Sequence, residues 1–165
     1  MDLARFLRHV FASRWLTRRR FSDAVDAAIE SAIESAEKRT GGEIRFVIET
    51  ALHPAAAWRG QSPRDRALDV FGQFRVWDTD ERNGVLIYVL VADRDVEIVA
   101  DRGAAAAVSP AGWEEVARRM EAEFRAGRFG DGAVAGVAGV GSLLEKHFPA
   151  RPVNRDELPN QPTLL

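Results

Sequence analysis

The sequence predicts an α/β domain built on a small mixed β-sheet. Residues 85–91 form a continuous apolar run, rich in β-branched side chains and bounded by turn-forming residues. Such a run is typical of a strand buried on both faces. Residues 43–49 mostly alternate between apolar and polar side chains, as a strand does. Because a helix is predicted between these two strands, they should be parallel and joined by a right-handed crossover.

The connecting helix and a hairpin complete this region. Ser62-Pro63 supplies an N-cap and a first-turn proline, and apolar residues follow at helical spacing as far as Phe74. After the central strand, Asp93-Arg94 can form a tight turn. Residues 96–100 should therefore return as an antiparallel strand, which makes the predicted sheet mixed.

Three further helices are predicted around the sheet. The first begins at Ser22 and ends at Gly41-Gly42, and the second begins at Ser109-Pro110. The third occupies residues 129–148 and has several glycines, which would let it approach the sheet closely. Residues 149–165 contain prolines and no periodic pattern, so they are expected to form an extended or disordered tail.

Composition limits the possible functions. The 165 residues are 46% hydrophobic, which predicts one folded domain, over residues 22–148. The absence of cysteine excludes disulfides, thiolate metal sites and cysteine nucleophiles. A formal net charge of -2 argues against nucleic acid as a partner. We find no transmembrane run or signal peptide, and therefore expect a cytoplasmic location, at or near the inner membrane.

Residues 1–20 predict a basic amphipathic helix. They contain six arginines and one aspartate, so this segment carries +5 and the rest of the chain -7. Apolar residues, including Phe6, Phe11 and Trp15, recur at helical spacing on one face. This face could pack on the domain, or it could lie on an anionic membrane surface or a membrane protein.

An acidic rim is the candidate site for chemistry. The predicted topology brings the start of the first strand, the loop before the central strand and the end of the hairpin to the same end of the sheet. These segments carry oxygen ligands that suit Ca²⁺ or Mg²⁺ rather than zinc, namely Glu43, Asp78, Asp80, Asn83 and Asp101. The alternative is a solvated rim, partly neutralised by Arg45, Arg82 and Arg102. The three histidines, at 9, 53 and 147, are scattered, and a Ser–His–Asp arrangement has no support.

Four blocks of residues, in order and at matching spacing, resemble the TPM domain family of thylakoid-lumen, photosystem-associated and membrane proteins. The blocks are Thr40-Gly41-Gly42-Glu43-Ile44-Arg45, then Asp78 with Asn83-Gly84-Val85-Leu86, then Asp93-Arg94-Asp95-Val96 with Ile98 and Gly103, and finally Phe124-Arg125 with Gly127, Phe129 and Asp131-Gly132. The resemblance implies a three-layer α/β/α sandwich and, as in some members, divalent-metal binding at acidic loops. It also implies the acid-phosphatase activity of plant relatives. Many bacterial members carry a signal peptide and a membrane anchor, whereas this sequence has only the basic N-terminal segment.

Two functions are therefore compared. The first is a TPM-type binding or regulatory domain with a Ca²⁺ or Mg²⁺ site, working near the membrane. The second is a metal-assisted phosphomonoesterase, in which a cation at Asp78, Asp80 and Asp101 would polarise phosphate and activate water. Arg82 or Arg102 would then bind the phosphate oxygens. The sequence favours the first, because no strong catalytic signature appears.

Overall fold

A computed structural model describes residues 2–150 and 156–165. The sheet has four strands in the order β3-β2-β1-β4, with bounds Glu43–Glu49 (β1), Gly84–Leu90 (β2), Asp95–Ala100 (β3) and Thr163–Leu164 (β4). Strands β1 and β2 are parallel and in register from the Glu43–Gly84 pair to the Glu49–Leu90 pair. Strand β3 is antiparallel to β2. The predicted mixed sheet is confirmed.

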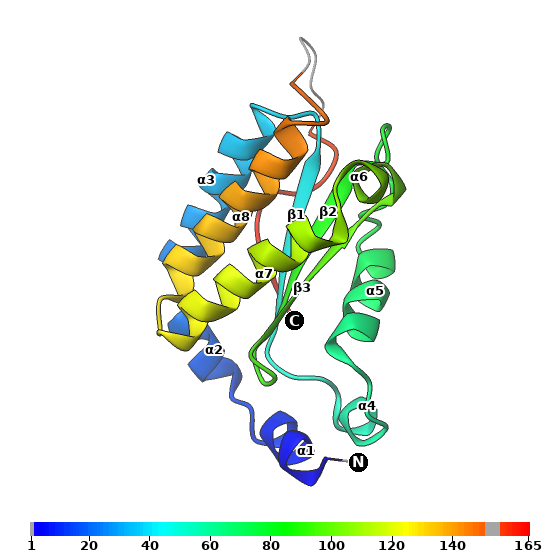
Figure 1. Cartoon of the computed structure of the whole chain (residues 1–165). Helices are drawn as coiled ribbons and strands as arrows, with labels where there is room; N and C mark the ends of the chain where they lie inside the picture. Colours follow the sequence, from blue (N-terminus) through cyan, green and yellow to red (C-terminus); the bar gives the residue numbers. More distant parts are fainter. Residues whose placement is uncertain (1, 151–155) are drawn as a thin grey trace.

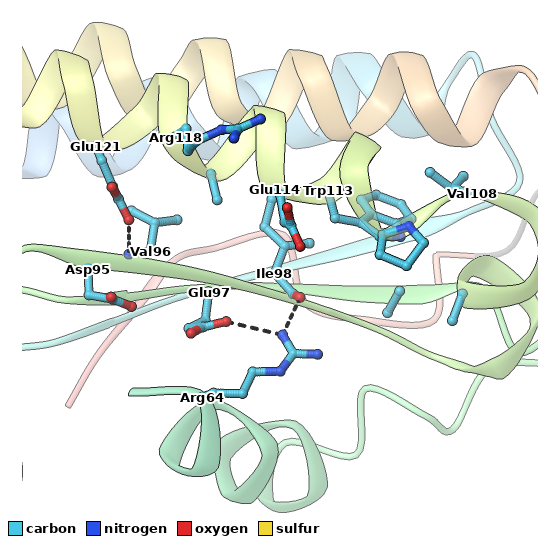
Figure 2. A pocket seen from close by; sticks show the side chains of 14 residues that line it. Arg64, Asp95, Val96, Glu97, Ile98, Val108, Trp113, Glu114, Arg118 and Glu121 are labelled. Atoms are coloured by element: carbon cyan, nitrogen blue, oxygen red, sulfur yellow. Dashed lines mark hydrogen bonds and ion pairs between the residues drawn. The ribbon is translucent and has the colours of Figure 1, made fainter. Parts of the chain in front are cut away.

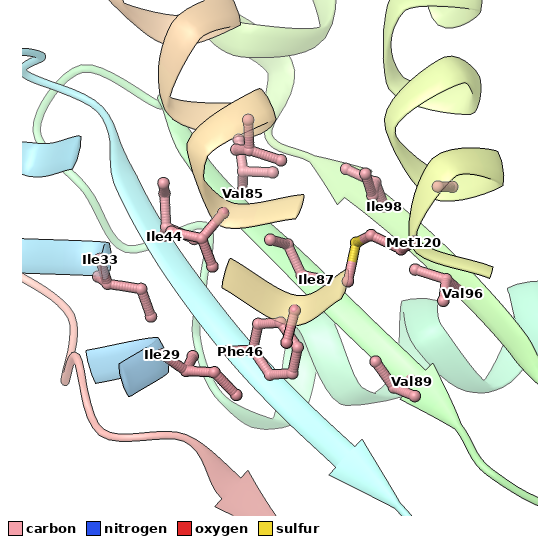
Figure 3. Close-up of a cluster of buried hydrophobic side chains, with 14 of the residues drawn as sticks. Ile29, Ile33, Ile44, Phe46, Val85, Ile87, Val89, Val96, Ile98 and Met120 are labelled. Atoms are coloured by element: carbon pink, nitrogen blue, oxygen red, sulfur yellow. The ribbon is translucent and has the colours of Figure 1, made fainter. Parts of the chain in front are cut away.

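Helices cover both faces of the sheet, as expected for a three-layer sandwich (Figure 1). Helices α3 (Asp23–Glu37), α7 (Pro110–Arg125) and α8 (Phe129–Glu145) pack on one face, and α5 (Pro63–Gln73) packs on the other. Alternate side chains of β1 and β2 enter the two cores because successive residues of a strand point to opposite faces. Figure 3 shows the larger core, where Phe46 and Ile87 meet Ile29 of α3 and Met120 of α7.

The glycines of the last helix, α8, allow it to pack closely against its neighbours. A Cβ added at Gly136 would lie 2.2 Å from the Met120 sulfur, and one added at Gly141 would lie 2.7 Å from the Ala36 Cβ. Glycine at these positions therefore lets α8 pack tightly against both α7 and α3. Side-chain packing rather than helix propensity stabilises this layer, since glycine lowers propensity by about 1 kcal/mol relative to alanine.

The prediction of one continuous helix over residues 1–20 is wrong. This segment forms α1 (Leu3–Val10) and α2 (Arg14–Arg20). The break occurs at Ser13, whose extended backbone and side-chain oxygen, 3.4 Å from the Leu16 amide, cap the second helix. The apolar periodicity continues across this break, and the sequence pattern therefore concealed it.

Two connections and the tail contain more structure than predicted. The loop after β1 contains α4 (Pro54–Trp58), and α6 (Arg102–Ala107) follows β3. In the tail, Thr163–Leu164 pairs in parallel with β1. Residues 151–155 of the predicted tail lie outside the described residues.

Candidate metal centre

The end of the sheet where β1 and β2 begin brings together the three segments of the predicted rim. Glu43, the first residue of β1, pairs with Gly84, the first residue of β2. The Asp101 amide donates a 2.9 Å hydrogen bond to the Gly84 carbonyl. Residues 78–83 lead directly into Gly84. The topological argument therefore placed these segments correctly, although it did not determine where their side chains point.

The loop side chains of the predicted rim have separate environments. Asp78 is largely exposed, with an oxygen 4.0 Å from an Arg75 nitrogen. Asp80 is exposed as well, and its backbone amide donates to Glu157 at 3.1 Å. Asn83 is buried, and its side-chain amide donates to the Gly41 carbonyl at 2.7 Å. Asn83 therefore joins the loop to the turn before β1.

Asp101 begins a helix. Its Oδ1 accepts a 2.7 Å hydrogen bond from the Arg102 amide at the start of α6. The Asp101 Oδ2 atom is buried, with no hydrogen-bond partner in the described part of the chain. Within residues 2–150 and 156–165, the one group of three or more possible ligands does not include Asp78, Asp80 or Asp101.

That group is formed by Glu37, Glu43 and Asp156, which come from three separate segments. Glu37 ends α3, Glu43 begins β1, and Asp156 belongs to the C-terminal segment. One carboxylate oxygen from each lies within 4.8 Å of the others. Glu37 and Glu43 are buried, whereas Asp156 is exposed, and the cluster can therefore be reached from solvent.

Backbone amides orient the two buried carboxylates. Glu37 Oε1 accepts a hydrogen bond from the Ile44 amide at 2.9 Å. Glu43 Oε2 accepts from the amides of Glu157 and Leu158, at 3.1 and 3.0 Å. Glu43 is thus one of the contacts that position the C-terminal segment against the sheet, and Asp156 immediately precedes the amides that it binds.

A buried arginine and an apolar residue also hold the C-terminal segment. The Arg45 guanidinium donates to the carbonyls of Pro159 and Gln161, at 2.6 and 2.7 Å, and lies over the Phe74 ring. Leu158 is buried in the smaller core. These contacts direct Arg45 toward the tail, so it serves the tail and not the loop carboxylates that it was expected to neutralise.

Burial gives the cluster unusual acid–base properties. It raises the pKa of Glu37 to about 8, and the nearby Glu43 and Asp156 charges act in the same direction. Burial likewise raises the pKa of Glu43 to about 7, although the two amide hydrogen bonds oppose the shift. A cation among these oxygens would favour their ionised forms.

The donor set fits a hard divalent cation. Carboxylate oxygens are the preferred ligands of Ca²⁺ and Mg²⁺. Asn160 adds another polar group, because its side chain lies 3.5 Å from Asp156 and hydrogen-bonds to Glu37. Its Oδ1 atom is buried and has no hydrogen-bond partner among the described residues.

Sequence reasoning found only Glu43 of this cluster. Glu37 resembles an ordinary residue of a helix C-terminal turn, and Asp156 lies in a segment with no periodic pattern. The short Gly41-Gly42 connection was an available signal, because it forces the end of α3 to lie near the start of β1. No comparable signal indicated that the tail returns to the same place.

Both arginines proposed to bind phosphate, Arg82 and Arg102, lie near the rim. Arg82 has a positive φ of 55°, and its carbonyl accepts hydrogen bonds from the amides of Gly103 and Ala104. Arg102 is the first residue of α6. A Cβ at Gly103 would lie 2.6 Å from the Arg82 carbonyl oxygen, so this close approach requires glycine.

At the opposite end of the sheet, α1 docks through polar contacts. Arg5 donates to Asp93 at 2.7 Å and to the Gln61 carbonyl at 2.8 Å. His9 is buried, with Nε2 3.1 Å from Asp93, and its Nδ1 accepts from the Leu52 amide at 3.1 Å. Since a backbone amide can only donate, the His9 proton lies on Nε2. His9 therefore has two partners, Asp93 and the Leu52 amide, that the sequence did not indicate.

Much of the apolar surface of α1 and α2 stays exposed despite this docking. The Phe6 ring packs edge-on against Trp58, with ring centroids 5.1 Å apart. Phe11 and Trp15 are 78% and 66% exposed, far more than a packed helix would leave them. Other large apolar residues are exposed on the same two helices, namely Leu3, Leu7, Val10 and Leu16.

The arrangement defines an α/β/α domain with a mixed sheet and an acidic cluster where its parallel strands begin. The TPM domain family model matches residues 18–143, and the chain belongs to this family. The BA42 protein of the psychrophilic bacterium Bizionia argentinensis is similar, at 35% identity and a TM-score of 0.77, over 87% of this chain and 94% of that one. The N-terminal domain of a P. gingivalis protein shares the fold at 20% identity and a TM-score of 0.61, over 79% and 82% of the two chains. A comparison with curated proteins gives no match.

None of the helices described here combines the length and apolar character needed to cross a bilayer.

Proposed function

We propose that this TPM domain is a binding domain that takes up Ca²⁺ or Mg²⁺ at Glu37, Glu43 and Asp156. The observation that supports the proposal is the convergence of three carboxylate oxygens, within 4.8 Å, from α3, β1 and the C-terminal segment. A bound cation would join these three segments. It would therefore stabilise the docking of the C-terminal segment against the sheet.

The acid–base properties of the cluster support this proposal. With pKa values of about 8 for Glu37 and about 7 for Glu43, both carboxyls retain protons near neutral pH when no cation is present. Metal binding requires the ionised carboxylates and therefore releases protons. Affinity should consequently increase between pH 6 and pH 8.

Thermal unfolding with and without Ca²⁺ tests the proposal. A ligand that binds only the folded state raises the melting temperature, and an excess of 100 times Kd contributes about 2.7 kcal/mol. We expect Ca²⁺ to stabilise the wild type but not Glu43→Gln. An equal calcium shift in both proteins would reject the proposed ligand set.

The loop carboxylates provide a competing location for the same cation. Asp78, Asp80, Asn83 and Asp101 remain a proposed site, and the contact between the Asp80 amide and Glu157 places the loop beside the cluster. The variant Asp78→Asn is the matched test. We expect it to retain the calcium response that Glu43→Gln loses, whereas the opposite result would favour the loop.

A metal-assisted phosphomonoesterase is the alternative function. It requires Asp78, Asp80 and Asp101 to share a cation, with Arg82 or Arg102 on the phosphate. The separate environments of the three aspartates make this less well supported. Turnover of p-nitrophenyl phosphate with and without Mg²⁺ tests it, and metal-dependent turnover that Asp78→Ala abolishes would establish it over the binding function.

We also propose that α1 and α2 associate with an anionic membrane surface. Exposed Phe11 and Trp15 and a +5 segment support this, because apolar insertion and charge attraction add at a lipid surface. Each basic residue near the surface contributes roughly 1 kcal/mol, which salt weakens. The polar contacts of Arg5 and His9 would fix α1, and the ion pair of Arg18 with Asp26 would fix α2, while exposed apolar side chains of both helices face outward.

Sedimentation with vesicles tests this association. We expect salt-sensitive binding to vesicles that contain phosphatidylserine and no binding to neutral vesicles. The double variant Phe11→Ser, Trp15→Ser should lose binding, whereas Trp77→Ser removes a similarly exposed aromatic residue elsewhere and should retain it. If the double variant binds like the wild type, another surface or a membrane protein must be considered.

A further inference from the structure

The outer edge of β3 borders a groove that neither the metal site nor the N-terminal helices use. The groove has a volume of about 600 Å³ and lies along β3, with α7 on one side and Arg64 of α5 on the other (Figure 2). Strand β3 is at the edge of the sheet, because the strand order is β3-β2-β1-β4. One side of its backbone therefore has no neighbouring strand among the residues that the structure describes.

The pairing of β3 determines which backbone groups face this groove. Hydrogen-bonded and non-hydrogen-bonded pairs alternate along an antiparallel ladder. The bond from the Asp101 amide to the Gly84 carbonyl fixes the alternation, so Val96, Ile98 and Ala100 direct their amides and carbonyls outward. This assignment agrees with the hydrogen bonds that the side chains of Arg64 and Glu121 form with outward-facing backbone groups of β3.

Those two side chains engage only part of the edge. Arg64 donates to the Ile98 carbonyl at 2.7 Å, and Glu121 accepts from the Val96 amide at 3.4 Å (Figure 2). Elsewhere in the described chain, no group bonds to the Ile98 amide or the Val96 carbonyl. The Ile98 amide and the Val96 carbonyl therefore remain available to an added strand. The Ile98 carbonyl can become available as well, because the Arg64 side chain is half exposed and can move aside.

The groove has an apolar end and an acidic end. Trp113, Val108 and Ile98 line the apolar end, and the indole Nε1 of Trp113 is buried with no hydrogen-bond partner among the described residues. At the other end, Asp95 lies near the charges of Glu97 and Glu121, and its Oδ1 atom is buried and equally unpartnered. Burial, followed by these charges, raises the pKa of Asp95 to about 6.

We propose that this groove binds an extended peptide segment of a partner protein, which adds to β3 as a further strand. A basic side chain of the segment would lie at Asp95 and Glu121, and an apolar side chain would lie against Trp113. Backbone hydrogen bonds provide affinity in such strand addition, and side-chain pockets provide specificity. The positive charge is the feature that identifies the partner, because Asp95 has no ion pair among the described residues, whereas Glu97 and Glu121 pair with Arg64 and Arg125.

The distance between the two ends sets the spacing in the segment. From Val96 to Ala100 a strand advances about 13 Å, at 3.3 Å per residue. Side chains on one face of a strand recur at every second residue. The basic and apolar side chains should therefore be four residues apart, which a peptide of seven residues can include.

Two capped peptides serve as probes, Thr-Arg-Thr-Val-Thr-Leu-Thr and the reversed sequence, because the strand could add in either direction. In amide NMR, we expect one of them to shift the signals of Ile98, Ala100 and the Trp113 indole in a saturable way. If saturating amounts of both peptides move none of these signals, the proposal is wrong.

Backbone methylation separates strand addition from simple side-chain contact. In the bound peptide, alternate amides face β3. Two N-methylated versions, methylated at odd or at even positions, should therefore differ, with one binding and the other at least tenfold weaker. Equal binding of both versions would contradict strand addition.

Charge reversal on α7 tests the acidic end. Glu121→Lys should weaken binding of the arginine peptide at least tenfold, whereas Glu115→Lys alters a residue on the same helix that does not line the groove and should have little effect. A second copy of this chain is the other possible occupant of the edge. Shifts at Ile98 that depend on protein concentration in the absence of peptide would favour that dimer and overturn the proposal.

Discussion

Two buried glutamates at opposite ends of β1 have contrasting environments. Glu43 and Glu49 are 2% and 7% exposed and lie on the same face of the strand. Glu49 accepts hydrogen bonds from Arg66 at 2.8 and 3.1 Å and from the Tyr88 hydroxyl at 2.7 Å. Glu43 accepts from backbone amides, and no ion pair among the described residues includes it.

The difference indicates two roles for a buried carboxylate. At Glu49 the chain supplies its own cation, so the carboxylate joins β1, β2 and α5. At Glu43 burial raises the pKa to about 7, and the charges of Asp156 and Glu157 act in the same direction. An external cation should therefore stabilise the Glu43 end of the strand, whereas the Glu49 end already has the Arg66 guanidinium as its cation.

The largest expected effect is at the Glu49 end. Arg66→Ala should lower the free energy of unfolding by about 3 kcal/mol, because it leaves a buried carboxylate without its cation. Arg64→Ala removes an arginine of the same helix that is half exposed in its ion pair with Glu97, and should cost less than about 1 kcal/mol. Urea denaturation measures both values, and equal losses would contradict the assignment of Glu49 as the structural carboxylate.

At the Glu43 end, stability should depend on pH in the absence of divalent cations. The pKa of Glu43 is raised in the folded state, so the folded protein binds more protons than the unfolded chain between pH 4.5 and about 7. Stability should therefore fall as pH increases through this window, by about 3 kcal/mol from Glu43 alone. Glu43→Gln should reduce this fall, and Ca²⁺ should offset it in the wild type.

A smaller effect of opposite sign is expected where α1 docks. Burial lowers the pKa of His9, although Asp93 acts against the shift. The contribution of neutral His9 is present above pH 6.5 and is lost as pH falls through the lowered value. Protonation places a hydrogen on Nδ1, which then cannot accept from Leu52. Hydrogen exchange at Leu52 should increase in mild acid before exchange in β2 does, and simultaneous increases would argue against a local role for His9.

The sequence predicted the features that depend on local patterns. The apolar run at 85–91, the proline-started helix at 63 and the turn at 93 were sufficient to place β2, α5 and β3. The direction of the strands then brought Glu43 and Asp101 to the same end of the sheet. These predictions succeeded because apolar runs, hairpin turns and helix caps depend on residues that are close together in the sequence.

The site itself depends on contacts between distant residues, which the sequence did not reveal. Asp156 reaches Glu43 because Arg45 and Leu158 hold the tail, and neither contact leaves a periodic signal. Asp78 attracted attention because it lies in an acidic loop, but its side chain is largely exposed. Acidic composition pointed to the end of the sheet where the Glu37, Glu43 and Asp156 cluster lies, and tertiary packing brings these three carboxylates together.

Calcium titration by calorimetry at pH 7, in two buffers with different ionisation enthalpies, tests the central claim most directly. Binding to carboxyls that retain protons should release about one proton per ion, and the heat should therefore differ between the buffers. We expect this release in the wild type and in Asp78→Asn, and its loss in Glu43→Gln. Binding without proton release, or unchanged binding in Glu43→Gln, would contradict the claim that Glu43 belongs to a cation site.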